Sequence, residues 1–452
     1  MKSIILSALV LSSALLATTR VNTISAAFSK GKVSANIKYY YIQTDKDKSY
    51  TNTKNTSAYA NTVGGQLHFD SASLYGFRAG VTFMTTNPFL LGSSVDASII
   101  GRDNGVRIEG NPSGTVARKG FSVLGEAYLA YDYQNAGVYI GREVIHTPLI
   151  DAKAVRLLPS AVEGASAHYT LAEKTKVIFS YYTGFKQRTS SVFTNIIEHA
   201  LGDKTKAITG SDSGSLEMLS FTHQANAYSL KAYDYYAENF LNSVYLDGSY
   251  KLNLSDVKVA FSGQYINQKS IGNADTYFGN NPSATGGKIS VNAIGLKVAT
   301  TIKSSKFILA YSKVLKENNK HDSLVLAWDG TPLYTNMITS NDLFSSNYGK
   351  SLGSDSIYIG NSQGIKFAYN QKYDNFGLKG FSTTLSYLDI SNSRFNKDQN
   401  DYNIVLQYKA PKAFVLQLKG IWVQNNTGAS ANGTISQLKL LSQYRVIANY
   451  KF

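Results

Sequence analysis

Seven cationic side chains recur on one face of the last three candidate strands and the first. In each strand this face lies opposite the apolar residues, as Lys419 does relative to Leu418 and Trp422. Ammonium and guanidinium groups repeated along a wetted face attract and guide carboxylates. Because a lone lysine near a strand end is often merely solvated, we expect about four of the seven to line a channel. The seven are Lys32, Lys38, Lys409, Lys419, Lys439, Arg445 and Lys451.

Carboxylates are candidates for the opposite side of such a channel. Glu126 and Asp132 lie on one candidate strand, and Asp247 lies on another. Rows of opposite charge that face each other create a transverse field, and such a field would orient a zwitterion.

Catalytic and metal-binding patterns are weak. Residues 360–364 match the Gly-x-Ser-x-Gly elbow, but that motif needs a strand–turn–helix and these residues lie in an alternating segment. Residues 349–351 are half a phosphate loop without its first glycine. The six histidines show no ligand spacing, and residues 45–49 lack the glycine of a calcium loop. We predict no enzyme, no metal and no other cofactor.

The elements that position the charges are segments of alternating apolar and polar residues. Short turns and long polar loops separate them in alternation, as in bacterial transmembrane barrels. We therefore predict an all-β, closed antiparallel barrel of about eighteen strands, with short periplasmic turns and long extracellular loops. The segments are 32–43, 59–71, 77–86, 121–133, 136–145, 162–170, 176–185, 216–224, 228–239, 243–252, 257–268, 288–302, 307–315, 357–373, 381–390, 401–410, 414–424 and 437–452.

The last segment carries the clearest pattern. Tyr444, Val446, Tyr450 and the terminal Phe452 point to one side, and the polar residues point to the other. One face suits lipid and the other suits water, as a membrane barrel requires. An aromatic last residue is a habitual ending of outer-membrane barrels, so we expect the barrel-assembly machinery to recognise this strand.

The amino terminus indicates export. A short basic start precedes an apolar run over 4–17, which is too short to span a bilayer. Small residues at 25–27 predict a signal peptide of residues 1–27, although Arg20 lies between the run and that bond. Residues 28–452 form a single predicted barrel domain. The chain has no cysteine, which suits passage through an oxidising periplasm.

The net charge of +15 restricts the partners. The basic residues are spread over strands and loops rather than clustered with stacking aromatics, so we predict no nucleic-acid partner. Anionic lipopolysaccharide outside the barrel, or an anion-attracting lumen within it, accounts better for the charge.

One segment carries a family resemblance. Residues 138–164 read VYIGREVIHTPLIDAKAVRLLPSAVEG, and this chain resembles the OprD-type outer-membrane porins here, especially their epsilonproteobacterial relatives. The matching residues are Gly141, Arg142, Thr147, Pro148, Asp151, Arg156, Pro159, Glu163 and Gly164. Glu143 stands where the family usually has Gln. Residues 64–65, 74–77 and 328–332 support the match. The resemblance implies an eighteen-stranded barrel, monomeric or weakly trimeric, whose third and seventh extracellular loops narrow the pore.

Physical reasoning supports an inward third loop. Residues 146–160 are nearly apolar apart from Asp151, Lys153 and Arg156, so this segment should not lie in bulk water. A barrel of this size leaves an aqueous channel that needs a constriction to be selective. We predict that Arg142, Asp151, Lys153, Arg156 and Asp329 line or narrow the pore.

The sequence therefore predicts a passive outer-membrane channel. Its expected cargo is small hydrophilic solutes that carry a carboxylate, such as amino acids and small organic acids. Two alternatives stay open: a structural or adhesive barrel with a plugged lumen, and an outer-membrane hydrolase. A conductance measurement would distinguish the plugged barrel from an open channel. A hydrolase would need clustered His, Ser and acidic side chains.

Overall fold

The structure is a computed structural model that describes residues 19–46, 56–89, 120–152, 156–282, 286–338, 360–393, 397–411, 413–426 and 438–452. Within these residues, eighteen long strands form one sheet. Their bounds are β2 (Lys32–Lys46), β3 (Thr56–Asp70), β5 (Phe77–Pro88), β6 (Phe121–Tyr133), β7 (Ala136–Glu143), β8 (Ala161–Ala172), β9 (Thr175–Lys186), β11 (Leu216–Gln224), β12 (Tyr228–Ala237), β13 (Leu241–Leu254), β14 (Val257–Ser270), β15 (Ser290–Ile302), β16 (Ser305–Val314), β17 (Ser362–Lys372), β18 (Phe381–Asn392), β19 (Lys397–Lys409), β20 (Phe414–Asn426) and β21 (Leu438–Lys451).

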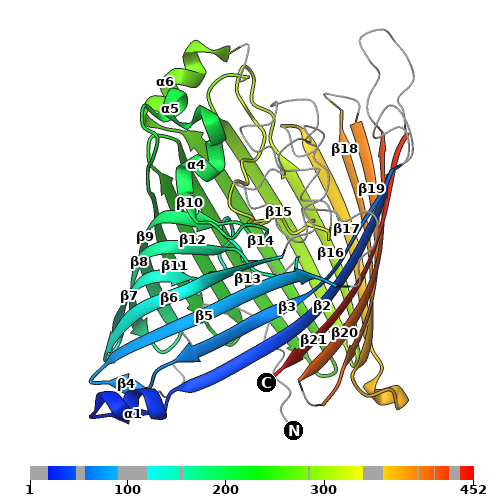
Figure 1. The fold of residues 1–452 in the computed structure, drawn as a ribbon. Coiled ribbons are helices and arrows are strands. Elements are labelled where there is room, and N and C mark those ends of the chain that lie inside the picture. Colours follow the sequence, from blue (N-terminus) through cyan, green and yellow to red (C-terminus); the bar gives the residue numbers. More distant parts are fainter. Residues whose placement is uncertain are drawn as a thin grey trace.

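The sheet closes on itself. Each long strand pairs antiparallel with its neighbours in chain order, and β2 pairs with β21 from Asn36↔Lys451 to Lys46↔Leu441. Closure leaves no open edge, so every strand has partners on both sides. The predicted all-β barrel of eighteen strands is confirmed, and Figure 1 shows its tilted wall.

Connections of different length separate the two ends of the barrel. At one end, here the short-turn end, strands are joined by tight turns such as the one between β6 and β7. Gln134, Ser255 and Lys303 have positive φ in these turns, as two-residue hairpins require. The opposite, long-loop end carries the connections β7–β8 and β16–β17, which are the third and seventh loops of the barrel.

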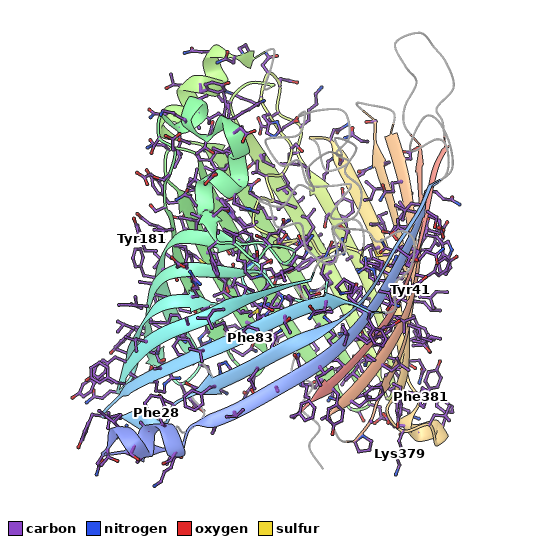
Figure 2. All side chains as sticks on the ribbon, in the orientation of Figure 1. Phe28, Tyr41, Phe83, Tyr181, Lys379 and Phe381 are labelled. Carbon is purple, nitrogen blue, oxygen red and sulfur yellow. The ribbon has the colours of Figure 1, made fainter. Side chains whose placement is uncertain are left out.

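The wall has an apolar outer face and a mostly polar inner face. On β21, Tyr444 and Tyr450 are 42% and 43% exposed, whereas Gln443 and Arg445 on the alternate face are 7% and 3% exposed. Figure 2 shows Tyr181 and Phe381 pointing away from the barrel. The exposed apolar band on alternate positions is the pattern that lipid contact requires. No helix among the described residues is long and apolar enough to cross a membrane.

Loops fill the long-loop half of the barrel with an apolar core. Leu149, Ile150 and Trp328 are each 1% exposed and belong to one cluster with wall residues such as Tyr235. The fourth loop adds the short strand β10 (Thr194–Asn195), the helices α4 (Ile196–Leu201) and α5 (Thr205–Thr209), and the 3-10 turn η1 (Gly202–Lys204). The sixth loop adds α6 (Gly272–Asn280), and Figure 1 shows these helices at the long-loop end.

Small elements decorate the short-turn end. They are β1 (Arg20–Val21), α1 (Ile24–Ser29), β4 (Ser73–Leu74) and the 3-10 turn η2 (Asp374–Phe376). In Figure 1, α1 and β4 lie together at this end of the barrel.

Candidate functional site

The candidate site is the inner face of the barrel. A cavity of about 550 Å³ opens there, lined by inward side chains of β2, β3, β5, β6, β7, β8, β9, β11 and β21. Cations and carboxylates both line it. Lys32 and Lys451 lie on the side of β2 and β21, and Asp70, Glu126 and Asp132 come from β3 and β6.

Three cations gather where β20, β21 and β2 meet. Lys419 and Arg445 are direct partners in the β20–β21 register, and Lys419 also lies within Coulombic range of Lys38. Arg445 donates from Nε to Gln443 Oε1 over 2.7 Å and from an η nitrogen to Tyr40 Oη over 3.2 Å. The alternation of the flanking strands places all three on the inner face, as the sequence predicts.

The other predicted cations are spread along the same strands. Lys32 and Lys451 line the cavity near the short-turn end, and Lys409 is exposed at the end of β19. Lys439 pairs with Asn425 in the backbone register, and its side chain lies outside the described residues.

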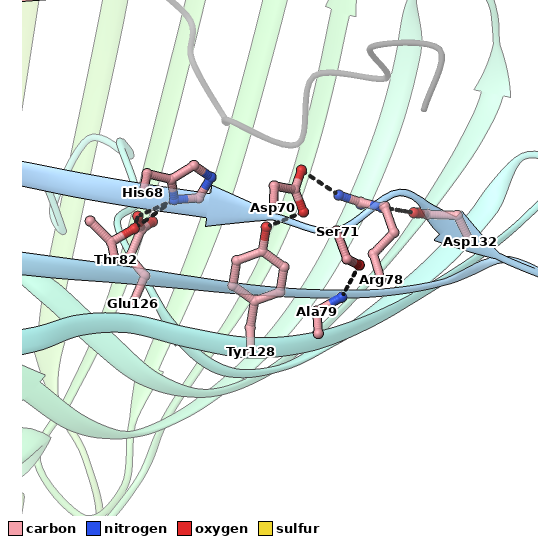
Figure 3. A network of polar contacts seen from close by, with 9 residues as sticks. All are labelled: His68, Asp70, Ser71, Arg78, Ala79, Thr82, Glu126, Tyr128 and Asp132. Atoms are coloured by element: carbon pink, nitrogen blue, oxygen red, sulfur yellow. Dashed lines mark hydrogen bonds and ion pairs between the residues drawn. The ribbon is translucent and has the colours of Figure 1, made fainter. Parts of the chain in front are cut away.

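The carboxylates of β3 and β6 are held in a network (Figure 3). The Arg78 guanidinium lies between Asp132 and Asp70: its η nitrogens are 2.8 Å from Asp132 Oδ2 and 3.5 Å from Asp70 Oδ2. Tyr128 donates its hydroxyl to Asp70 Oδ1 over 3.0 Å. Glu126 accepts a hydrogen bond from Thr82 and lies 3.8 Å from His68 Nδ1. These contacts fix the acids in place against one part of the wall.

Asp247 belongs to a second group, next to the seventh loop. Its Oδ2 accepts hydrogen bonds from the hydroxyls of Tyr245 on β13, over 3.2 Å, and Tyr334 in the seventh loop. Lys231 faces Asp247 in the β12–β13 register, and Lys297 lies 3.9 Å from the centre of the Tyr334 ring. A cation over an aromatic face is attracted by the ring quadrupole. These contacts attach the seventh loop to the wall.

The third loop lies inside the barrel and touches the seventh. The amide of Asp151 donates to Trp328 O over 3.2 Å, and the amide of Gly330 donates to Leu149 O over 3.1 Å. The Asp151 carboxylate also pairs with His146 Nδ1 over 2.8 Å. Lys153 lies outside the described residues.

Two wall lysines hold the third loop by its carbonyls. Lys38 Nζ donates to Arg156 O over 2.8 Å and to Leu157 O over 3.3 Å. Lys186 is fully buried, and its Nζ donates to Pro159 O over 3.1 Å, Gln187 O over 3.1 Å and Ser190 O over 3.3 Å. The ammonium groups thus fasten both the loop and the beginning of the fourth loop to the wall.

Asp329 joins three loops. Its carboxylate accepts a hydrogen bond from Ser160 in the third loop and forms an ion pair with Arg188 in the fourth. Its backbone has φ +63°, a conformation that residues other than glycine seldom adopt. The neighbouring Trp328 donates its indole N–H to Ile196 O over 3.0 Å. The carboxylate is therefore at the centre of the contact between the three loops.

Arg142 lies on the outer face of β7. It shares its face of β7 with Ile140, which is 63% exposed, whereas Tyr139 and Glu143 on the alternate face line the cavity. Its Nε pairs with Glu163 Oε2 over 2.6 Å, and its guanidinium lies 4.3 Å from the Phe193 ring centre. Strand alternation therefore places this predicted pore residue on the outer face of the wall.

The sequence analysis missed several inward charged residues. Lys231, Lys297 and Lys366 lie on inner faces of strands to which the alternation was not extended, and the same rule would have found them. The same rule would have found Arg78, which lies on the inner face of β5 between its partners on β3 and β6. Lys186 was missed because its partners are loop carbonyls. Among the described side chains, no group of three or more His, Cys, Asp or Glu could hold a metal ion.

One comparison with known proteins identifies a family. A family model described as outer membrane porin, OprD family, matches residues 26–452. A search of curated proteins found no match.

Several solved structures share the fold at low sequence identity. The chain is similar to Pseudomonas aeruginosa OccK9 (OpdG), with a TM-score of 0.73 and 13% identity over 94% of this chain and 99% of that chain. P. aeruginosa OpdK, solved with vanillate, has a TM-score of 0.68 and 13% identity, again over 94% of this chain and 99% of that chain. P. aeruginosa OccK2 (OpdF), in complex with glucuronate, gives 0.67 and 12%, also over 94% and 99%. The chain therefore belongs to the OprD family of bacterial outer-membrane porins, which are transport channels and not enzymes.

Proposed function

We propose that this porin is a passive diffusion channel for small hydrophilic solutes that carry a carboxylate, such as amino acids and small organic acids. The observation that carries the proposal is the run of inward cations on β20, β21 and β2, in which Lys419 lies within Coulombic range of both Arg445 and Lys38. A positive wall lowers the energy of an anion in the lumen, and the weak attraction still permits exit.

The relatives support a carboxylate substrate class. One was solved with vanillate and another with glucuronate, and both molecules carry a carboxylate. The fixed acids around Arg78 line the same cavity as Lys32 and Lys451, and Asp70 is the register partner of Lys32. Cations and carboxylates side by side suit solutes that also carry a positive charge.

We further propose that the third and seventh loops form the constriction. Two observations support this proposal. The Gly330 amide donates a hydrogen bond to Leu149 O, and further hydrogen bonds attach both loops to the wall. A narrow charged passage selects by width and by electrostatic barrier, without any bond being made or broken.

A variant set tests the role of the cations. Lys32, Lys419 and Lys451 would each be replaced by Gln, and the matched control would replace Lys174, Lys303 and Lys379 in turns at the short-turn end. A lysine charge and an anion about 6 Å apart in water attract each other by about 0.7 kcal/mol. Removing one such charge should therefore lower the anion occupancy about threefold. Liposome uptake of a small carboxylate should fall more than uptake of a neutral sugar of equal size. Equal loss of both solutes would count against guidance by these lysines.

A plugged structural barrel is the second candidate, favoured by the dense packing of Leu149, Ile150 and Trp328 in the long-loop half. Planar-bilayer recording separates the two functions. A diffusion channel gives discrete conductance steps and, in a salt gradient, a reversal potential of the anion-preferring sign. Absence of conductance from folded protein would favour the plugged barrel.

A further inference from the structure

Residues 19–30 form a folded element at the short-turn end, which faces the periplasm in such barrels. The amide of Ser73 donates to Thr19 O over 3.1 Å, and the amide of Ala72 donates to Ala27 O over 2.8 Å. Strand β1 pairs in parallel with β4. The segment is thus hydrogen-bonded at both of its ends to the connection between β3 and β5.

A small core and a cap stabilise the segment. Val21, Ala27 and Ala72 are 5%, 6% and 4% exposed and form a cluster of their own. Thr23 caps α1 by accepting a hydrogen bond from the Ala26 amide over 3.2 Å. The residues around the predicted signal-peptidase bond are therefore part of the packed structure.

The outer side of α1 is apolar and exposed. Ile24 and Phe28 are 68% and 61% exposed, and their spacing of four residues puts them on one face of the helix. The Phe28 ring stacks on Phe69, with centroids 5.9 Å apart and an interplanar angle of 5°. Phe69 shares the outer face of β3 with Leu67, which is 53% exposed. The apolar side of α1 therefore continues the lipid-facing band of the barrel (Figure 2).

We propose that residues 19–30 remain in the mature porin and that α1 lies in the periplasmic leaflet, with Ile24 and Phe28 among the phospholipid chains. Short helices with exposed aromatic and aliphatic residues bind at the headgroup–acyl boundary. Continuity with the lipid-facing band through the Phe28–Phe69 stack favours lipid over a protein partner. Signal peptidase then cleaves where the apolar run ends, near Ala17, since cleavage after Ala27 would remove β1 and most of α1.

The first test reads the mature amino terminus directly. The protein would be purified from outer membranes, and its first residue would be determined by terminal sequencing and intact mass. The expected first residue lies at or before Thr19. A mature chain that begins at Phe28 would overturn the proposal.

The second test locates α1 relative to lipid. The natural chain has no cysteine, so Ile24→Cys and Phe28→Cys each accept one nitroxide label without background. Leu67→Cys is the lipid-facing reference and Ser29→Cys the matched exposed control on the same helix. In phosphatidylethanolamine–phosphatidylglycerol vesicles, labels at 24 and 28 should resemble the reference, with high oxygen and several-fold lower nickel-chelate collision rates than at Ser29.

Two outcomes would contradict lipid contact. Nickel-chelate collision rates at 24 and 28 equal to those at Ser29 would place this face in water. Dipolar broadening between labels at residue 28 that disappears on dilution with unlabelled protein would indicate a second copy as the partner. Neither result depends on conductance, so the proposed function and this inference can fail separately.

Discussion

The buried ammonium of Lys186 should control how firmly the third and fourth loops stay inside the barrel. Replacement by Met keeps an unbranched side chain that is one atom shorter, and it removes all three donated hydrogen bonds. A hydrogen bond to a charged group is worth about 1.5–3 kcal/mol, whereas each carbonyl left unpaired costs about 1 kcal/mol. Removing the charge also ends its desolvation penalty, which offsets part of the loss.

We therefore expect Lys186→Met to weaken loop closure by about 2 kcal/mol net, which is about thirtyfold in the equilibrium between closed and detached loops. The barrel itself should remain folded, because the strand ladder does not involve Nζ. Single-channel recording checks this directly: the variant should visit a higher conductance level far more often than the natural protein. The matched control is Lys174→Met, since Lys174 lies in a turn at the periplasmic end.

Folding of the variant is verified by its β-rich circular dichroism and by resistance of the barrel to protease. A folded Lys186→Met channel with unchanged conductance levels and dwell times would refute the reasoning. That result would mean that the apolar contacts of Leu149 and Trp328 hold the loops without the ammonium.

Three further variants test the loop core, the inward cations and the seventh loop. Trp328→Ala should destabilise the loop core by about 3–5 kcal/mol and raise single-channel conductance. Unchanged conductance would mean that the seventh loop does not narrow the pore. Lys419→Gln should shift the reversal potential in a salt gradient toward cation preference, whereas Lys379→Gln should not. Burial lowers the pKa of His321 in the seventh loop to about 4. Because the unfolded loop binds a proton near pH 6.5, stability should fall by up to about 3 kcal/mol between pH 6.5 and pH 4. Protease cleavage of the seventh loop should rise over this range in the natural protein but not in His321→Gln.

Alternation made most of the wall predictable from sequence. The period of two placed Lys38, Lys419 and Arg445 on the inner face because their neighbours on the same strands are apolar and face outward. The same rule, applied to residues 138–142, would have placed Arg142 on the outer face. It was assigned to the pore from the motif alone, and strand geometry decided otherwise.

The loops were less predictable. Residues 186–214 were expected to be a polar loop, yet they contain α4, whose Asn195 cap precedes Ile196 and Ile197. An Asn followed by apolar residues at helical spacing is a start signal that could have been found. The contact between Asp329, Ser160 and Arg188 was beyond sequence reasoning, because it depends on how three separate loops meet inside the barrel.

The pairing of β2 with β21 gives the wall a seam between the two ends of the chain. Across it, the Gln443 amide reaches Thr44 Oγ1 over 2.7 Å, between residues 399 positions apart. The barrel therefore cannot close until its last strand has been synthesised and pairs with β2. Until then two edge strands are unpaired and can form hydrogen bonds with other chains. The 14 residues of β21 therefore determine when the barrel closes.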